Sequence, residues 1–209
     1  MGKGIIAVIV IVVLLLGVLI FFGQYVSVKN TLVAKNEGVK AAWSQVDIVL
    51  QRRADLIPNL VETVKGYAQQ EQTVFGDIAK ARSALLSAGT PQQKIAANGQ
   101  LDGALGRLLL IVENYPQLKS NENFLRLQDE LAGTENRIAV ERRRYNDTLQ
   151  DYNTYIQQFP NSVFAGWAGF KPNDAYFAAS EGSRQAPKVN FGTPNTAAPQ
   201  TNPQPAPAH

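Results

Sequence analysis

The sequence predicts an all-α fold, in which an N-terminal transmembrane helix is followed by an antiparallel four-helix bundle. Three observations support this fold class. Residues 5–22 form an apolar run without a charged side chain. Beyond this run, apolar residues recur at alternating steps of three and four, which is the helical period, and no useful length alternates with the period of two that indicates a strand. The 209 residues are enough to bury one core beside terminal appendages.

The apolar run at residues 5–22 has the length of a membrane-spanning helix. At about 1.5 Å per residue it extends over about 27 Å, which is close to the hydrocarbon thickness of a bilayer and longer than the apolar part of a cleavable signal peptide. No Ala-x-Ala pattern comes after it, so we expect an uncleaved anchor at residues 1–24, with Tyr25 as an interfacial aromatic. A buried core helix is the alternative, although such a helix normally carries a polar stripe.

Two indications disagree about the side of the membrane on which the bundle lies. Lys3 precedes the apolar run, whereas Lys29, Lys35 and Lys40 come after it, and the positive-inside rule therefore favours a cytoplasmic bundle. A very short basic N-terminus before an apolar run is, however, the ordinary arrangement of a signal anchor that exports the domain on its C-terminal side. We expect a single-pass protein whose bundle is extracytoplasmic.

Residues 25–160 are predicted to form the bundle, and Pro58 decides how its first part is divided. Proline lacks an amide hydrogen and disfavours helical angles in the preceding residue, so we expect one helix over residues 24–56 and a second over residues 58–88. The alternative is a single helix over residues 24–88 that is kinked at Pro58, because no glycine or polar turn surrounds this proline.

The remaining helix ends have clearer signals. Ala88-Gly89 closes the second helix, and Thr90-Pro91-Gln92-Gln93 supplies an N-cap, an N1 proline and a capping box for the third. Tyr115-Pro116 ends that helix, and a fourth helix is expected from near Ser120 to Phe159. These lengths suit a four-helix antiparallel bundle.

After the fourth helix the composition changes twice. Residues 161–185 contain aromatic side chains among glycines and one proline, Pro172, whereas residues 186–209 contain six of the eleven prolines and one charged side chain, Lys188. Such a tail cannot bury enough apolar surface to fold, so we expect it to be disordered.

The aromatic-rich segment is expected close to the bilayer. An up-and-down bundle of four helices returns the chain to the end at which it began, and this chain begins at the membrane. Aromatic rings favour the headgroup depth of a bilayer. The candidate interface residues are Tyr25, Phe164, Trp167 and Phe170. The alternative is that these rings cap the open end of the bundle.

Polar side chains are densest around Pro58. We expect this cluster to couple across the bundle to polar residues midway along the fourth helix, because unpaired charges near an inward stripe are costly to bury. It would serve either as interhelical ion pairs that set the helix register or as an interaction surface. The candidate residues are Arg52, Arg53, Asp55, Pro58, Asn59, Glu135, Asn136 and Arg142.

The composition disfavours an enzyme. The chain has no cysteine, and its one histidine, His209, is the last residue of the tail, which leaves no thiolate, no disulfide and no histidine for catalysis. We therefore expect no catalytic residue, no cofactor and no metal. Arg137 and the run Arg142-Arg143-Arg144 are interpreted as a solvated helix face, and a net charge of +3 gives no reason to expect nucleic acid as a partner.

Several motifs resemble one known family. They include Arg52-Arg53-x-Asp55-Leu56-Ile57-Pro58-Asn59-Leu60 and Thr134-Glu135-Asn136-Arg137-Ile138-Ala139, with Tyr115-Pro116 and Phe159-Pro160. Together they resemble the LemA family of bacterial membrane proteins, over the anchor and most of residues 25–177. The sequence departs from the family at Gln70-Glu71, where many members have His-Glu.

The resemblance implies a membrane helix and an antiparallel bundle in the bacterial cytoplasmic membrane, with no established catalytic activity. One member of the family is associated with magnetosome membranes, and genomic neighbours include membrane proteases. We therefore expect a scaffold or adaptor whose partners are the lipid bilayer, other envelope proteins including membrane proteases, and further copies of itself. A signal-sensing bundle that binds a small ligand or peptide is the alternative, and an unrecognised enzyme is the third hypothesis.

Overall fold

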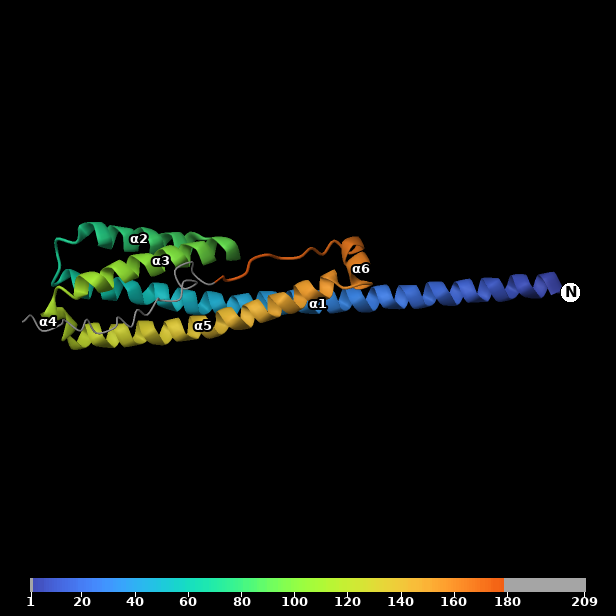
Figure 1. The fold of residues 1–209 in the computed structure, drawn as a ribbon, viewed down its shortest axis with the longest axis horizontal. Helices are drawn as coiled ribbons and strands as arrows, with labels where there is room; N and C mark the ends of the chain where they lie inside the picture. The colour runs from blue at the N-terminus through green and yellow to red at the C-terminus, as the bar shows by residue number, and fades with distance from the viewer. Residues whose placement is uncertain (1, 179–209) are drawn as a thin grey trace, which may run out of the picture. The chain divides into compact units, whose positions relative to one another are not determined.

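The computed structural model describes residues 2–178, and Figure 1 shows how they are arranged. All regular secondary structure within these residues is helical, which confirms the predicted all-α class. The helices are α1 (Gly2–Lys65), α2 (Gln72–Ser87), α3 (Pro91–Val112), α4 (Pro116–Lys119), α5 (Glu122–Gln157) and α6 (Asn161–Trp167). The tail predicted at residues 186–209 and the last part of the aromatic-rich segment lie outside the described residues.

Within the described residues, only α1 is long and apolar enough to cross a membrane. Its side chains from Ile5 to Phe22 are exposed, and its first buried side chain is that of Val28. The helix then continues without interruption to Lys65. The candidate span and the longest helix of the bundle are therefore one helix.

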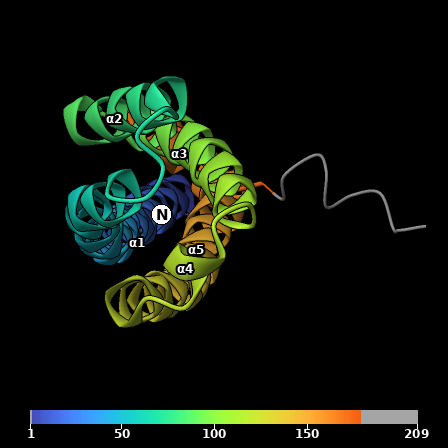
Figure 2. The same ribbon diagram turned by 90° about the vertical axis from the view of Figure 1, so that its left-hand side faces the viewer.

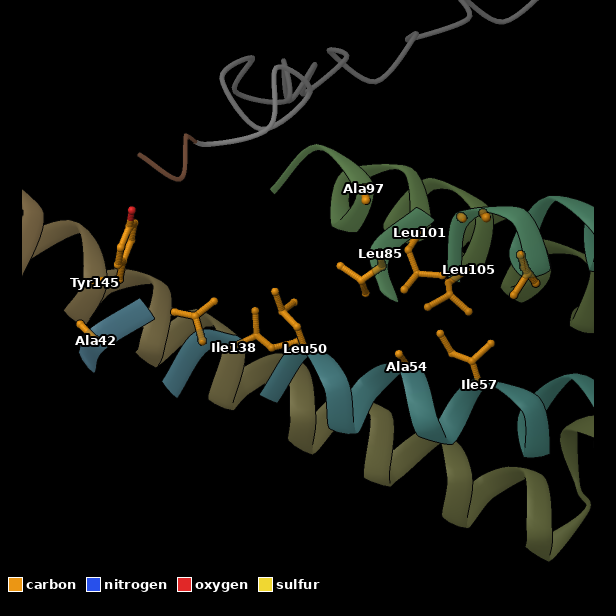
Figure 3. Close-up of a cluster of buried hydrophobic side chains, with 14 of the residues drawn as sticks. Ala42, Leu50, Ala54, Ile57, Leu85, Ala97, Leu101, Leu105, Ile138 and Tyr145 are labelled. Atoms are coloured by element: carbon orange, nitrogen blue, oxygen red, sulfur yellow. The ribbon is translucent and has the colours of Figure 1, made fainter. Parts of the chain in front are cut away.

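Four long helices, α1, α2, α3 and α5, alternate in direction (Figure 1). α5 runs back along α1, while α2 and α3 form a hairpin that packs on the part of α1 far from the N-terminus. Seen from that end, α1 lies between the hairpin and α5 (Figure 2). Ala54 and Ile57 of α1 face Leu85 of α2 and Leu101 and Leu105 of α3 in the buried core (Figure 3).

The predicted break at Pro58 is wrong, because α1 passes through this residue. A proline leaves the carbonyl oxygen four residues earlier without its helical donor, and here that oxygen belongs to Ala54. Arg82 of α2 replaces the missing donor, since its Nε–H donates to the Ala54 oxygen at 2.7 Å. The side chains of Ile57 and Leu60 are buried, whereas Pro58 is exposed. Core packing and the arginine together keep the segment helical.

The first turn of the bundle lies instead at residues 66–71, between α1 and α2. The continuous helix over residues 24–88 is therefore wrong as well. Gly66 and Tyr67 close the last turn of α1, and Ala68 is fully buried. Four long helices remain, but the first extends further beyond the apolar run than expected, to Lys65 instead of residue 56.

The helix boundaries predicted from capping signals are confirmed. Thr90 Oγ1 accepts the N–H of Gln93 at 3.3 Å, and Gln93 Oε1 accepts the N–H of Thr90 at 3.2 Å, which completes the capping box of α3. α3 ends before Tyr115-Pro116, and the short α4 comes next. Asn121 caps α5 by accepting the N–H of Phe124 at 3.0 Å.

An extended segment after α6 runs along α5 as far as Phe177. Asn153 donates to the carbonyl oxygen of Asn173 at 2.7 Å and accepts its N–H at 2.9 Å. Asn146 likewise donates to the carbonyl oxygen of Phe177 at 2.8 Å and accepts its N–H at 3.0 Å. Because the two asparagines are one heptad apart, they lie on one face of α5, and they tie this segment to the bundle.

Candidate functional site

A buried arginine interrupts the apolar core of α1. Val46, Leu50, Arg53, Ile57 and Leu60 are buried and follow one another at steps of four and three, so Arg53 occupies an inward position between apolar residues. Its exposed fraction is only 7%. A buried guanidinium needs compensating partners, so this position defines where the neighbouring helices must supply acceptors.

α3 and α5 supply these acceptors to one guanidinium nitrogen, Arg53 Nη1. It donates to Asn98 Oδ1 at 3.1 Å and to Asp102 Oδ1 at 2.5 Å, and it forms an ion pair with Glu135 Oε2 at 3.1 Å. Asn98 also donates to Asp102 Oδ2 at 3.0 Å. Three helices thus meet in one polar layer, which we define as Arg53, Asn98, Asp102 and Glu135.

Arg142 of α5 lies beside the polar layer. Its Nη2 is 3.9 Å from Asp102 Oδ2, and its guanidinium lies 5.0 Å from the centre of the Phe177 ring. Arg142 therefore links the polar layer to the extended C-terminal segment. Phe177 also packs against Trp43 and Tyr145, with ring centres 6.0 Å from each.

Tyr145 is a buried phenol in this neighbourhood. Its hydroxyl makes no hydrogen bond within residues 2–178. Burial, assisted by the nearby Tyr176, raises the pKa of Tyr145 to about 12. The neutral side chain therefore functions as a core aromatic of the α1–α5 pair.

The structure brings Arg53, Glu135 and Arg142 together around Asp102, but it leaves the other predicted residues at the surface. Those exposed residues are Arg52, Asp55, Pro58, Asn59 and Asn136. Asp55 accepts a hydrogen bond from Gln51 at 2.9 Å on its own helix. The cluster near Pro58 is therefore divided between a buried arginine and a solvated face.

Sequence reasoning missed Asn98 and Asp102 of α3. Asn98 is 1% exposed and continues the inward stripe of Leu101, Leu105 and Leu108 at steps of three and four. The signal that could have found it is an asparagine at a core position of a helix, with a carboxylate four residues later on the same face. Arg53 interrupts its own stripe in the same way.

A pocket of about 230 Å³ adjoins the polar layer. Arg53 and Leu60 of α1 lie on one side of it, and the other lining residues come from α3 and α5. Those residues are Leu105, Leu109, Gln128, Leu131, Ala132 and Glu135. Arg53 Nε and Glu135 Oε2 are buried without a hydrogen bond in the described part of the chain. Among the described residues, Arg53 Nε is therefore a buried donor without a partner at a mostly apolar pocket, whereas Glu135 Oε2 has only its ion pair with Arg53 Nη1.

The geometry of the polar layer suits the alignment of the three helices. Within residues 2–178, no three histidine, cysteine or carboxylate side chains are grouped as metal ligands. The carboxylates of the polar layer face arginines, which hold them as ion-pair partners. A polar layer of this kind fixes how helices align, because a shifted register would leave its charges unpaired.

A second cluster lies where the apolar part of α1 ends. Phe164 of α6 packs edge-to-face on Phe21 at 5.3 Å and on Tyr25 at 6.0 Å, and Trp167 lies 5.9 Å from Phe21. We call Phe21, Tyr25, Phe164 and Trp167 the aromatic collar. The predicted interface residue Phe170 is not part of it, because this ring packs against the core.

Comparison with known proteins gives one consistent result. A profile of the LemA family matches residues 42–191. Magnetosome proteins MamQ 1 and MamQ 2 of Paramagnetospirillum magneticum are each 27% identical over 186 residues, which covers 77% of this chain and 68% of theirs. Protein LemA of Metamycoplasma hominis is 27% identical over 163 residues, which covers 78% of this chain and 74% of its own.

Proposed function

Because the chain belongs to the LemA family, we propose that it is a non-enzymatic, membrane-anchored protein of the bacterial cell envelope, whose bundle acts as a scaffold or adaptor for other envelope proteins. The observation that carries the proposal is the continuity of α1 from Gly2 to Lys65. An anchor that continues as the longest helix of the bundle gives attached partners a fixed place relative to the membrane. The relatives named as magnetosome proteins support membrane association.

The geometry of α1 sets the reach of such a scaffold. From Phe22, at the end of the apolar run, to Lys65, the helix extends over about 65 Å at 1.5 Å per residue. α5 packs against α1 over much of this length (Figure 1). Partners held on the bundle would therefore lie up to several nanometres from the bilayer, on the extracytoplasmic side in our proposal.

Exposed apolar side chains offer a place for a protein partner. Val140 of α5 is 64% exposed. It lines a depression of about 350 Å³ together with Val49 of α1 and the polar residues Asn136, Arg137 and Glu141. An apolar centre with a polar rim is the usual composition of a protein interface. Asn136, exposed and outside the polar layer, would act there.

Crosslinking in intact membranes tests the scaffold. The chain has no cysteine, so Val140→Cys can carry a single photoreactive maleimide, and the exposed Lys80→Cys on α2 is the matched control. We expect adducts with defined envelope proteins, or with a second copy of the chain, at position 140 and not at position 80. Equal adducts at both positions, or none at either, would contradict the proposal.

The same control variant tests the orientation. Lys80→Cys lies on the bundle, so a small membrane-impermeant maleimide should label it in intact cells. Labelling that requires cell lysis would place the bundle in the cytoplasm and contradict the extracytoplasmic part of the proposal. The scaffold itself would then still be tested by the crosslinking above.

The pocket beside Arg53 favours a second function, in which the bundle senses a small amphipathic ligand. The Arg53 Nε–H, which makes no hydrogen bond within the described residues, would meet a polar head, and the leucines of the pocket would meet an apolar chain. Native mass spectrometry of the detergent-extracted chain should then show a bound small molecule that Ala132→Phe, which fills the pocket, removes. An identical spectrum for both proteins would exclude this function.

A further inference from the structure

The aromatic collar joins a helix after the bundle to the end of the candidate membrane span. Phe21 and Tyr25 come from α1, and Phe164 and Trp167 come from α6. α6 lies beside α1 at the point where α5 ends (Figure 1). Phe21 belongs to the last turn of the apolar run, so the collar lies at the height where a bilayer would end.

α6 leaves an apolar face uncovered at this height. Phe164 and Ala165 are buried against the rest of the bundle, whereas Val163 and Trp167, four residues apart and therefore on one face, are 42% and 65% exposed. Phe159, just before the helix, is 85% exposed. Exposure of large apolar side chains to water is unfavourable, and such an exposed patch indicates a site of contact with a protein or a membrane.

α1 near the collar and the chain around α6 both lack charged side chains. α1 carries no charged side chain between Lys3 and Lys29, and the chain carries none between Asp151 and Lys171, which includes all of α6. Lys35 of α1 pairs with Asp151 of α5 at 2.5 Å. Charged pairs therefore begin on the side of the collar that faces away from the apolar run.

From these three observations we infer that α6 is a membrane-seating element: its exposed face, formed by Val163 and Trp167, lies in the headgroup region of the bilayer, together with the exposed Phe159 just before the helix. Indole and phenol rings are favourable at this depth, and contact with the apolar run makes the collar continuous with the span. Two points of attachment, α1 and α6, would fix the tilt of the bundle as well as its depth. This inference rests on the proposed membrane anchoring.

Tryptophan fluorescence in proteoliposomes tests the depth of the collar. The chain has two tryptophans, so Trp43→Phe leaves Trp167 as the only one. Lipids brominated near the headgroup should quench Trp167 strongly, and lipids brominated deep in the acyl chain should quench it less. Trp167→Phe is the matched control, because Trp43 lies about 30 Å beyond Phe22 along α1 and should be quenched by neither lipid.

Three outcomes separate the collar from the anchor. Each variant is first checked for folding by circular dichroism and for membrane insertion by flotation with its liposomes. A folded chain that does not float would overturn the anchor, and with it the membrane seating of α6. A chain that floats while Trp167 is not quenched would overturn the membrane seating of α6 but not the anchor. The exposed rings of α6 would then be assigned to a protein contact. Val163→Trp, in a chain with both native tryptophans replaced by phenylalanine, should be quenched like Trp167. Absence of quenching at position 163 would also contradict the membrane seating of α6.

Discussion

Replacing Arg82 by methionine should destabilise the bundle, and the loss should depend on the residue at position 58. Pro58 has no amide hydrogen to give to the Ala54 carbonyl, and the Arg82 Nε–H occupies that acceptor at 2.7 Å. Ala54 is fully buried, so water cannot replace the arginine easily. Methionine keeps most of the length and apolar stem of arginine while it removes the donor.

The expected magnitude depends on the burial of the acceptor. A hydrogen bond from a charged donor contributes about 1.5–3 kcal/mol, and leaving a buried acceptor unsatisfied costs a similar amount. We therefore expect Arg82→Met to lower the free energy of unfolding by about 2 kcal/mol. Pro58→Ala restores the backbone donor and should stabilise α1, because an interior proline costs about 3 kcal/mol. In that background Arg82→Met should cost about 1 kcal/mol or less.

Urea unfolding followed by far-UV circular dichroism measures these differences. The chain from residue 25 onward is suitable, because every buried side chain of α1 lies at Val28 or beyond. Arg107→Met is the matched control: Arg107 of α3 pairs with Asp77 at 3.0 Å but is 58% exposed, and exposed pairs contribute about 1 kcal/mol or less. The double-mutant cycle of positions 58 and 82 isolates the interaction.

Additive effects of the substitutions at positions 58 and 82 on the free energy of unfolding would refute the reasoning. If Arg82→Met costs the same with proline and with alanine at position 58, the arginine does not replace the missing backbone donor. A cost no larger than that of Arg107→Met would lead to the same conclusion. Packing of α1 alone would then have to explain why the helix continues through Pro58.

Four further predictions concern the core, the polar layer and the anchor. Ile138→Ala should lower the unfolding free energy by about 2–5 kcal/mol, because Ile138 is fully buried, and unchanged urea unfolding would contradict this. A cycle of Arg53→Ala with Glu135→Ala should give a coupling energy of about 0.5–1.5 kcal/mol in the same assay, and zero would remove this pair from the polar layer. The pKa of Tyr145 is raised from 10.0 to about 12 in the folded state. Because the unfolded state loses this proton first, the free energy of unfolding should fall as pH rises from 10 to about 12. Urea unfolding at several pH values should show that Tyr145→Phe removes this part of the fall. Carbonate extraction should leave the full chain in the membrane pellet and release the chain lacking residues 1–24, and release of the full chain would contradict the anchor.

Much of the fold could be predicted locally. The span candidate at residues 5–22 needs only its length and lack of charge, and the capping box at Thr90 and Gln93 needs only neighbours within one turn. The inward stripes of α1 and α5 can be deduced from helical periodicity, since each residue's face depends on its own helix. The class of fold and most helix ends were therefore readable without any tertiary contact.

Two other features depend on contacts between segments far apart in the chain. Whether Pro58 breaks α1 depends on Arg82, which lies on another helix and is 28 residues away from Ala54. The partners of Arg53 come from α3 and α5, and the sequence indicated Glu135 but not Asn98 or Asp102. Local residue patterns determine where helices form and which faces are apolar, but the pairing of buried polar atoms depends on which faces meet, and only tertiary packing decides that.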